Sequence, residues 1–120
     1  MATASQVLTG LVAALHLYFL VLEMFLWATP FGAKTFARPL EEMQQTKPLA
    51  ANQGLYNGFL AAGLVWSLVV PDLRVRVFFL ACVVIAGLFG AATASKKILF
   101  IQALPGAAAL AVTLAISCGA

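Results

Sequence analysis

The chain has 120 residues, of which 63% are hydrophobic and 9% are charged. A water-soluble domain is only about half apolar and cannot hide this much apolar surface at this length, so the composition excludes an ordinary soluble protein. The net charge of +3 does not indicate nucleic-acid binding, because the basic residues lie in short gaps between apolar runs. We therefore expect an all-α integral membrane protein surrounded by lipid.

Four apolar stretches are long enough to cross a bilayer as α-helices, which takes about 20 residues each. They lie at about 6–28, 50–70, 76–94 and 98–118. Short connections make the later helices antiparallel neighbours, so we predict one domain over 1–120, an antiparallel four-helix bundle. The long connection at about 30–49 is expected to be a loop with room for a short surface helix.

The basic residues predict an orientation in the bilayer. Five of them fall in the first and third connections, namely Lys34, Arg38, Lys47, Lys96 and Lys97. The second connection has two, Arg74 and Arg76. The excess predicts that the first and third connections are cytoplasmic and that both termini are outside. The N-terminus carries no basic region of the kind a cleavable signal peptide has, so we expect the first helix to remain.

Small residues and cysteines give weaker indications. Gly54 and Gly58 form a GxxxG pattern, and a small-residue face at 87–94 lies on the third helix. We expect these faces to pack the second helix on the third, with a contact between protomers as the alternative. Cys82 and Cys118 lack CxxC spacing, so no metal site is expected, and whether they form a disulfide stays open.

The first helix carries three candidate site residues on one stripe. His16, Glu23 and Trp27 follow at spacings of seven and four residues, which places them on the same helical face. A carboxylate in the apolar zone is costly, so Glu23 should point into the bundle and have partners. For Trp27 the alternative is an anchor at the membrane interface.

The other three helices carry amides and hydroxyls at a similar depth. Counting about 1.5 Å per residue, Glu23, Asn57 and Gln102 lie about 6 to 10 Å from the same membrane face. The candidate ligand-binding residues are Asn52, Gln53, Asn57, Thr93, Gln102 and Trp27. We expect them to form one polar site in the cytoplasmic half, with hydrogen bonding between helices as the purely structural alternative.

Four segments carry a resemblance to a known family. They read HLYFLVLEMFLWATPFG at 16–32, AANQGLYNGFLA at 50–61, GLFGAATA at 87–94 and ILFIQALPGAAAL at 98–110. Together they resemble an uncharacterised bacterial membrane family, domain of unknown function 1304. The resemblance covers nearly the whole chain and implies that the eight candidate residues are the family's characteristic polar positions, in a protein of the bacterial inner membrane. It supplies no reaction.

A looser likeness is to the membrane-associated eicosanoid and glutathione metabolism proteins, which are also four-helix bundles. This chain departs from them because its second helix has no arginine or glutamate. Its third and fourth helices also lack the basic residues expected to hold glutathione. The likeness is one of architecture.

Three functions remain open from the sequence. The first is binding of, or catalysis on, a small lipophilic molecule, with Glu23 or His16 as acid or base and the amides orienting its polar end. The second is proton-coupled transport of a small solute or ion, with the same two residues as a relay; four helices are few for a pore, so this version needs a homo-oligomer. The third is a structural or partner-binding subunit. Whether the protein is an enzyme stays open, and no cofactor is expected.

Overall fold

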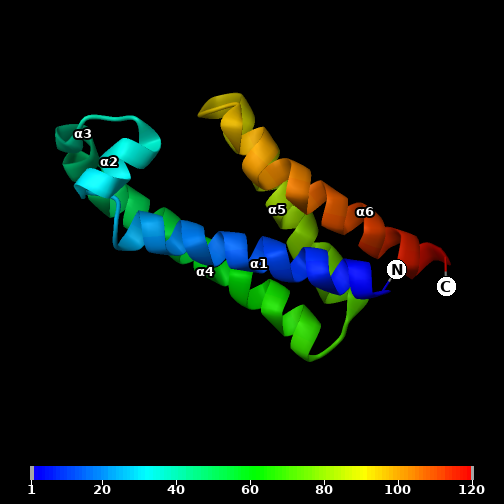
Figure 1. Cartoon of the computed structure of the whole chain (residues 1–120). Coiled ribbons are helices and arrows are strands. Elements are labelled where there is room, and N and C mark those ends of the chain that lie inside the picture. Colours follow the sequence, from blue (N-terminus) through cyan, green and yellow to red (C-terminus); the bar gives the residue numbers. More distant parts are fainter. Residues whose placement is uncertain (1, 120) are drawn as a thin grey trace. The chain divides into compact units, whose positions relative to one another are not determined.

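The computed structural model describes residues 2–119, and every regular element within them is a helix. The elements in chain order (Figure 1) are α1 (Ala2–Met24), α2 (Pro30–Phe36), α3 (Leu40–Gln45), α4 (Lys47–Val69), α5 (Leu73–Thr93), the π-helix η1 (Leu99–Ala103) and α6 (Leu104–Gly119). The predicted all-α class is confirmed.

The predicted number of helices was wrong, because residues 2–119 contain six α-helices and one π-helix. Two of the extra helices, α2 and α3, occupy the region 30–49 that was predicted mainly as a loop. The start of α2 has a local cause: the Thr29 hydroxyl accepts a hydrogen bond from the backbone N–H of Gly32 at 3.2 Å, and Pro30 stands at the first helical position. The helix ends at Phe36, and the next residue, Ala37, has a left-handed φ of 53°.

Three helical stretches are long and apolar enough to cross a membrane. They are Ala2–Met24, Leu73–Thr93 and Leu99–Ser117, the last formed by η1 and α6 in succession. The fourth predicted span corresponds to α4, which at 23 residues is as long as α1. Its first half carries several amide side chains, which lower its mean hydropathy. The structure therefore confirms that α4 is a helix. By composition, α4 is not among the three described helical stretches that are apolar enough to cross a membrane.

The described chain divides into two compact units. The terminal unit comprises residues 2–14 and 60–119, and the central unit comprises residues 15–59. Both α1 and α4 contribute to each unit. The apolar core of the terminal unit is built from small and aliphatic side chains, namely Val12, Ala13, Leu64, Leu80, Val83 and Ala109.

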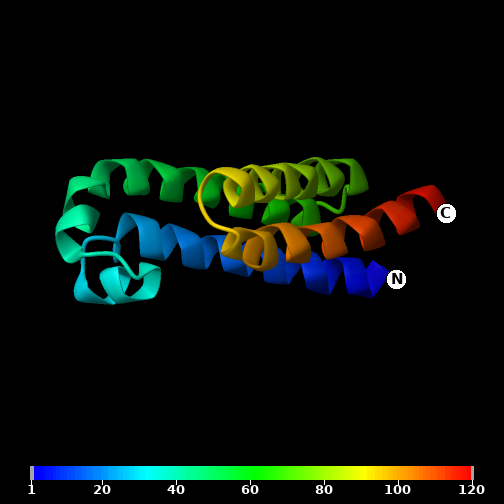
Figure 2. The same ribbon diagram turned by 90° about the horizontal axis from the view of Figure 1, so that it is seen from above.

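Glycines bring α5 and the η1–α6 stretch together within the terminal unit. A Cβ atom at Gly87 would come within 2.8 Å of the Ala103 backbone nitrogen, and one at Gly106 within 2.8 Å of Cγ1 of Val83. The two contacts run in opposite order along the chain, so the two stretches are antiparallel, joined by the turn after Thr93 (Figure 2). The small-residue face of α5 thus packs on η1 and α6; the prediction that it packs on the second predicted helix was wrong.

The GxxxG pattern of α4 also has a different partner from the one predicted. Within the central unit, a Cβ atom at Gly54 would lie 2.6 Å from Cγ of Met24, and one at Gly58 would lie 2.7 Å from Cδ1 of Leu20. Both partners belong to α1, so the pattern packs α4 against α1 inside the chain. The backbones approach closely because glycine has no side chain to hold them apart.

Candidate functional site

Glu23 and Asn57 meet in the central unit. The Nδ2 group of Asn57 donates a hydrogen bond to Oε1 of Glu23, and both side chains are half-buried. The approach depends on Gly54, which lies one turn before Asn57 on α4. A Cβ atom at Gly54 would lie only 3.1 Å from the Cβ atom of Glu23, so the absence of a side chain there leaves room for Glu23. The contact therefore joins the last turn of α1 to the polar first half of α4.

The carboxyl group of Glu23 has an amide partner but no basic one. The two ion pairs among residues 2–119 are Arg38–Glu42 and Arg74–Asp72. Asn57 is the one described residue bonded to the Glu23 carboxyl group, so this group retains oxygen lone pairs that can accept further hydrogen bonds. Such a group can take up a proton or bind a donor group of a ligand.

His16 lies on α1 two turns before Glu23 and is fully buried. Its ring packs edge-on against Phe19, with 5.3 Å between the ring centroids. A separation of seven residues along a helix corresponds to about 10 Å between the two backbone positions, so a proton relay between these side chains would need a water molecule or the substrate between them.

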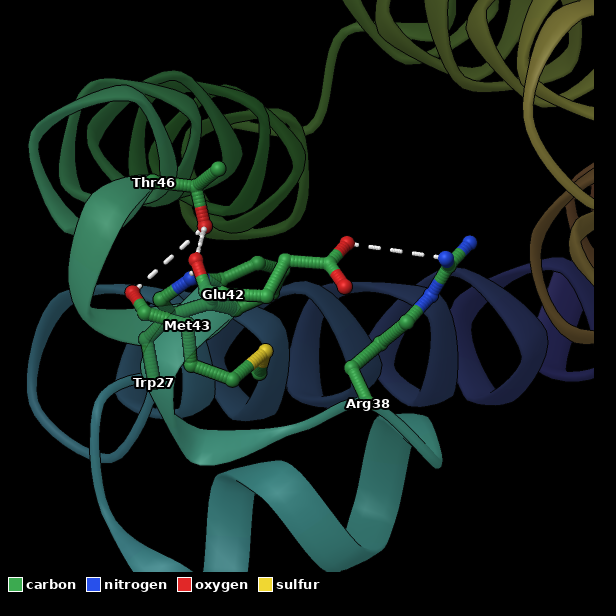
Figure 3. Close-up of polar contacts among 5 residues, drawn as sticks. All are labelled: Trp27, Arg38, Glu42, Met43 and Thr46. Carbon is green, nitrogen blue, oxygen red and sulfur yellow. Dashed lines mark hydrogen bonds and ion pairs between the residues drawn. The ribbon is translucent and has the colours of Figure 1, made fainter.

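Trp27 makes two side-chain contacts within the central unit. Its indole Nε1 donates to Oγ1 of Thr46 at 2.9 Å, and its ring lies 4.8 Å from that of Phe36. The Thr46 hydroxyl in turn donates to the backbone carbonyl of Glu42 at 2.9 Å, as the close-up in Figure 3 shows. Trp27 thus contacts α2 and the residue after α3, and both of its predicted roles, in ligand binding or as an anchor at the membrane interface, stay predictions.

The remaining candidates on α4 are exposed. Asn52 and Gln53 lie in its second turn, and neither makes a hydrogen bond to any other residue in the part of the chain that the structure describes. Gln53 is one turn before Asn57, so both project from one side of α4. Their amide groups remain available to a ligand or to another protein.

Thr93 and Gln102 belong to the terminal unit. Thr93 is exposed, and its hydroxyl donates to the carbonyl of Phe89 in its own helix at 2.7 Å. Gln102 is half-buried within η1, where the N–H of Leu104 bonds to the carbonyl of Leu99, five residues earlier. Pro105 has no N–H to donate, which favours such a local π-turn before it. The convergence of these two residues with Glu23 and Asn57 stays a prediction.

A second polar cluster, centred on Arg76 in the terminal unit, was not predicted from the sequence. Arg76 was predicted to be a charge at the membrane surface, yet it is only 3% exposed. Ser5 and Thr113, from the two ends of the chain, meet beside it. The one sequence signal was an arginine in the first turn of an apolar helix, a pattern shared by ordinary flanking charges.

Whether Cys82 pairs with Cys118 is not described by the structure, because the side chain of Cys118 lies outside the described residues.

Comparison with known proteins agrees with the resemblance seen in the sequence. Residues 10–114 match the model of a family described as "Protein of unknown function (DUF1304)". The chain is also 28% identical over 106 residues to the "Uncharacterized protein YpaA" of Lactococcus lactis subsp. lactis (strain IL1403), a match covering 85% of this chain and 89% of that protein. No solved structure matches. The chain therefore belongs to the DUF1304 family.

Proposed function

We propose that this chain is an integral membrane protein whose Glu23–Asn57 site binds a small lipophilic molecule by its polar end. The observation that carries the proposal is the half-buried carboxyl group of Glu23, which lies in a helix apolar enough to cross a membrane and is held by one amide without a basic partner. An ionisable side chain inside a membrane costs free energy, and such residues commonly have a polar partner or a function.

The surfaces of the apolar helices support the membrane part of the proposal. Large apolar side chains are exposed along them, for example Leu11 on α1, Ile85 and Phe89 on α5, and Leu104 on α6. Water would leave this surface uncompensated, whereas lipid covers it. We propose that α4 completes a four-helix antiparallel bundle, because its length suits a crossing and its polar half can be buried against neighbours.

The exposed charges support the proposed orientation. Lys34 and Lys47 in the first connection and Lys96 and Lys97 in the third are all exposed, as charges at a membrane surface should be. Arg76 is buried, so only Arg74 remains as an exposed basic residue near the second connection. This strengthens the assignment of the first and third connections to the cytoplasm and of both termini to the outside.

The ligand is expected to carry a hydrogen-bond donor, such as a hydroxyl or an amine, on an apolar body. The Glu23 carboxyl group on α1 can accept from that donor, and the exposed amides of Asn52 and Gln53 on α4, the helix of Asn57, can bond to further polar atoms. An apolar body would lie among the large apolar side chains, which supports entry from the bilayer.

The test compares what copurifies with the wild type, with Glu23→Gln and with Glu41→Gln, a control at an exposed glutamate on α3. Each protein is purified in mild detergent, and its bound small molecules are identified by mass spectrometry. A lipophilic compound should remain with the wild type and the control, and should fall about tenfold in Glu23→Gln, the loss expected for one hydrogen bond to a charged group. Equal amounts in all three would overturn the proposal.

The same variant separates the other two functions. Proton-dependent uptake of a solute into liposomes, abolished by Glu23→Gln and not by Glu41→Gln, would indicate transport in place of binding. A protein with no specific copurifying compound and no uptake would be a structural or partner-binding subunit. Neither alternative is favoured by a particular contact in the structure.

A further inference from the structure

Arg76 is the centre of a buried polar cluster that joins four helices of the terminal unit. Its Nη1 donates to Oγ of Ser5 on α1 at 2.9 Å, and its Nη2 donates to the backbone carbonyl of Ser67 on α4 at 3.2 Å. Oγ of Ser5 lies 2.6 Å from Oγ1 of Thr113 on α6. Ser5, Ser67 and Thr113 are all fully buried.

The hydroxyl groups form a chain with one direction. Thr113 donates its single hydroxyl proton to the carbonyl of Ala109 at 2.7 Å, so it acts as acceptor toward Ser5. Ser5 therefore accepts from Arg76 and donates to Thr113. Both hydroxyl protons are used, and every oxygen bonded to the guanidinium group is neutral.

The positive charge of Arg76 has no counter-charge in the described structure. The one acidic residue in the described part of the terminal unit is Asp72, and its carboxylate pairs with Arg74 at 3.2 Å. An arginine cannot lose its proton to escape burial, as a lysine can. A buried cation of this kind is unfavourable unless an anion compensates it.

Two buried donor groups of the terminal unit have no hydrogen-bond partner in the described structure. The Nε–H of Arg76 has no hydrogen-bond partner, and neither has the hydroxyl of Thr9, which lies one turn after Ser5 on the same face of α1. The Nε–H and an Nη–H of a guanidinium group form a fork that matches two oxygens of a carboxylate or a phosphate. An oxyanion would satisfy this fork and neutralise the charge together.

The position of Arg76 indicates what else the anion carries. Arg76 is the fourth residue of α5, a helix apolar enough to span a membrane, so it lies about 5 Å from the start of that helix. This is the depth at which lipid headgroups meet the acyl chains. Leu80, one turn further into α5, belongs to the apolar core.

We propose that Arg76, with Thr9, binds the oxyanion of an anionic amphiphile, either a phosphate monoester or a carboxylate on an alkyl chain. The anion accepts from the unused Nε–H and from an Nη–H of the guanidinium group, beside the neutral oxygens that are already bonded. The site lies in the terminal unit and does not rest on the function proposed for Glu23.

The experiment measures equilibrium binding to the whole protein in a non-ionic detergent, with four probes: dodecyl phosphate, dodecanoate, inorganic phosphate and dodecanol. The wild type should bind at least one of the two charged alkyl probes, at least about tenfold more tightly than dodecanol and inorganic phosphate. Arg76→Gln should lose this affinity. Arg74→Gln, a change at an exposed arginine two residues away, should retain it.

Each other outcome counts against the proposal. Equal affinity for dodecyl phosphate and inorganic phosphate would assign the site to a free oxyanion, and tight binding of dodecanol would remove the role of the charge. Unchanged affinity in Arg76→Gln would place the anion elsewhere. If Arg76→Gln does not fold, Arg76→Lys and Thr9→Val take its place, and both should bind the charged alkyl probe several-fold more weakly because one loses the fork and the other a donor.

Discussion

The two units each withdraw one charged side chain from water, Arg76 in the terminal unit and Glu23 in the central unit. Neither has an ion-pair partner among residues 2–119. The consequences differ because a carboxyl group can become neutral by binding a proton, whereas a guanidinium group stays charged. The carboxyl group of Glu23 can therefore lose its charge by protonation, whereas the charge of Arg76 can be compensated only by an anion such as the amphiphile proposed above.

The two units also differ in how they bring their polar groups together. The Glu23–Asn57 contact depends on two helices and on the glycines that let them approach. The Arg76 cluster takes contacts from four helices and is enclosed by buried side chains. A ligand can reach the half-buried central pair more directly, and we expect the terminal cluster to be the more rigid of the two.

The largest expected effect comes from a substitution at Gly54, where α4 packs closely on α1 in the central unit. Gly54→Val should lower the free energy of unfolding by about 1–3 kcal/mol, because its Cβ would approach Cγ of Met24 to 2.6 Å and force α1 away from α4. Unfolding by SDS in mixed micelles measures the change. The control is Gly10→Val on α1, where an added Cβ meets nothing within 4 Å and the loss should be smaller than about 1 kcal/mol.

A smaller effect tests whether Glu23 and Asn57 are energetically coupled. A double-mutant cycle with Glu23→Gln and Asn57→Leu should give a coupling energy of about 0.6–1.7 kcal/mol, the range found for hydrogen bonds between membrane helices. The same cycle with Asn52→Leu serves as control, because Asn52 is exposed and bonds to no other described residue. Equal coupling in both cycles would show that the contact of Glu23 with Asn57 contributes nothing specific.

Two threonines in the terminal unit should respond with opposite sign. Thr113→Val removes the acceptor of Ser5 and should destabilise the protein by about 1 kcal/mol. Thr9→Val removes a buried hydroxyl that has no hydrogen-bond partner, and should be neutral or stabilising by up to about 1 kcal/mol. Thermal unfolding monitored by circular dichroism compares them. A loss in Thr9→Val as large as that in Thr113→Val would mean that the Thr9 hydroxyl is satisfied.

The helices were largely predictable, because apolar runs of about 20 residues encode membrane-length helices directly. The short helices α2 and α3 were not, since part of their support is distant in sequence: Trp27 reaches Thr46 and Phe36. The GxxxG pattern predicted a close helix contact without identifying the partner helix, because the pattern describes only one of the two surfaces.

Of the two polar sites, the Glu23–Asn57 contact was predictable from the sequence and the Arg76 cluster was not. Counting residues from the ends of the predicted helices placed Glu23 and Asn57 at one depth, and the structure joins them by a hydrogen bond. The Arg76 cluster was not predictable, because Ser5 and Thr113 are 108 residues apart and each is an ordinary small polar residue in an apolar helix. Only the packing of the helices shows that Ser5 bonds both to Arg76 and to Thr113.

The smallest effect concerns the exposed ion pair beside the cluster. The Arg74 side chain, hydrogen-bonded to Asp72, lowers the pKa of that carboxyl group below its ordinary value of 3.8. A lowered pKa means stability that is present above about pH 4 and is lost as the pH falls through the lowered value. Asp72→Asn keeps the helix cap on α5 but loses the charge, so its stability relative to the wild type should be lower at pH 7 and should recover in acid.

This prediction also separates the two arginines of α5. Asp72 stands one turn before Arg76, a spacing suited to an ion pair, yet its carboxylate bonds to Arg74. If Arg76 takes its counter-charge from a bound amphiphile, Asp72→Asn should leave dodecyl phosphate or dodecanoate binding unchanged while it alters the acid dependence of unfolding. Tighter binding in Asp72→Asn would instead show that Asp72 already compensates the buried charge, and the terminal unit would then resemble the central one in needing no external ion.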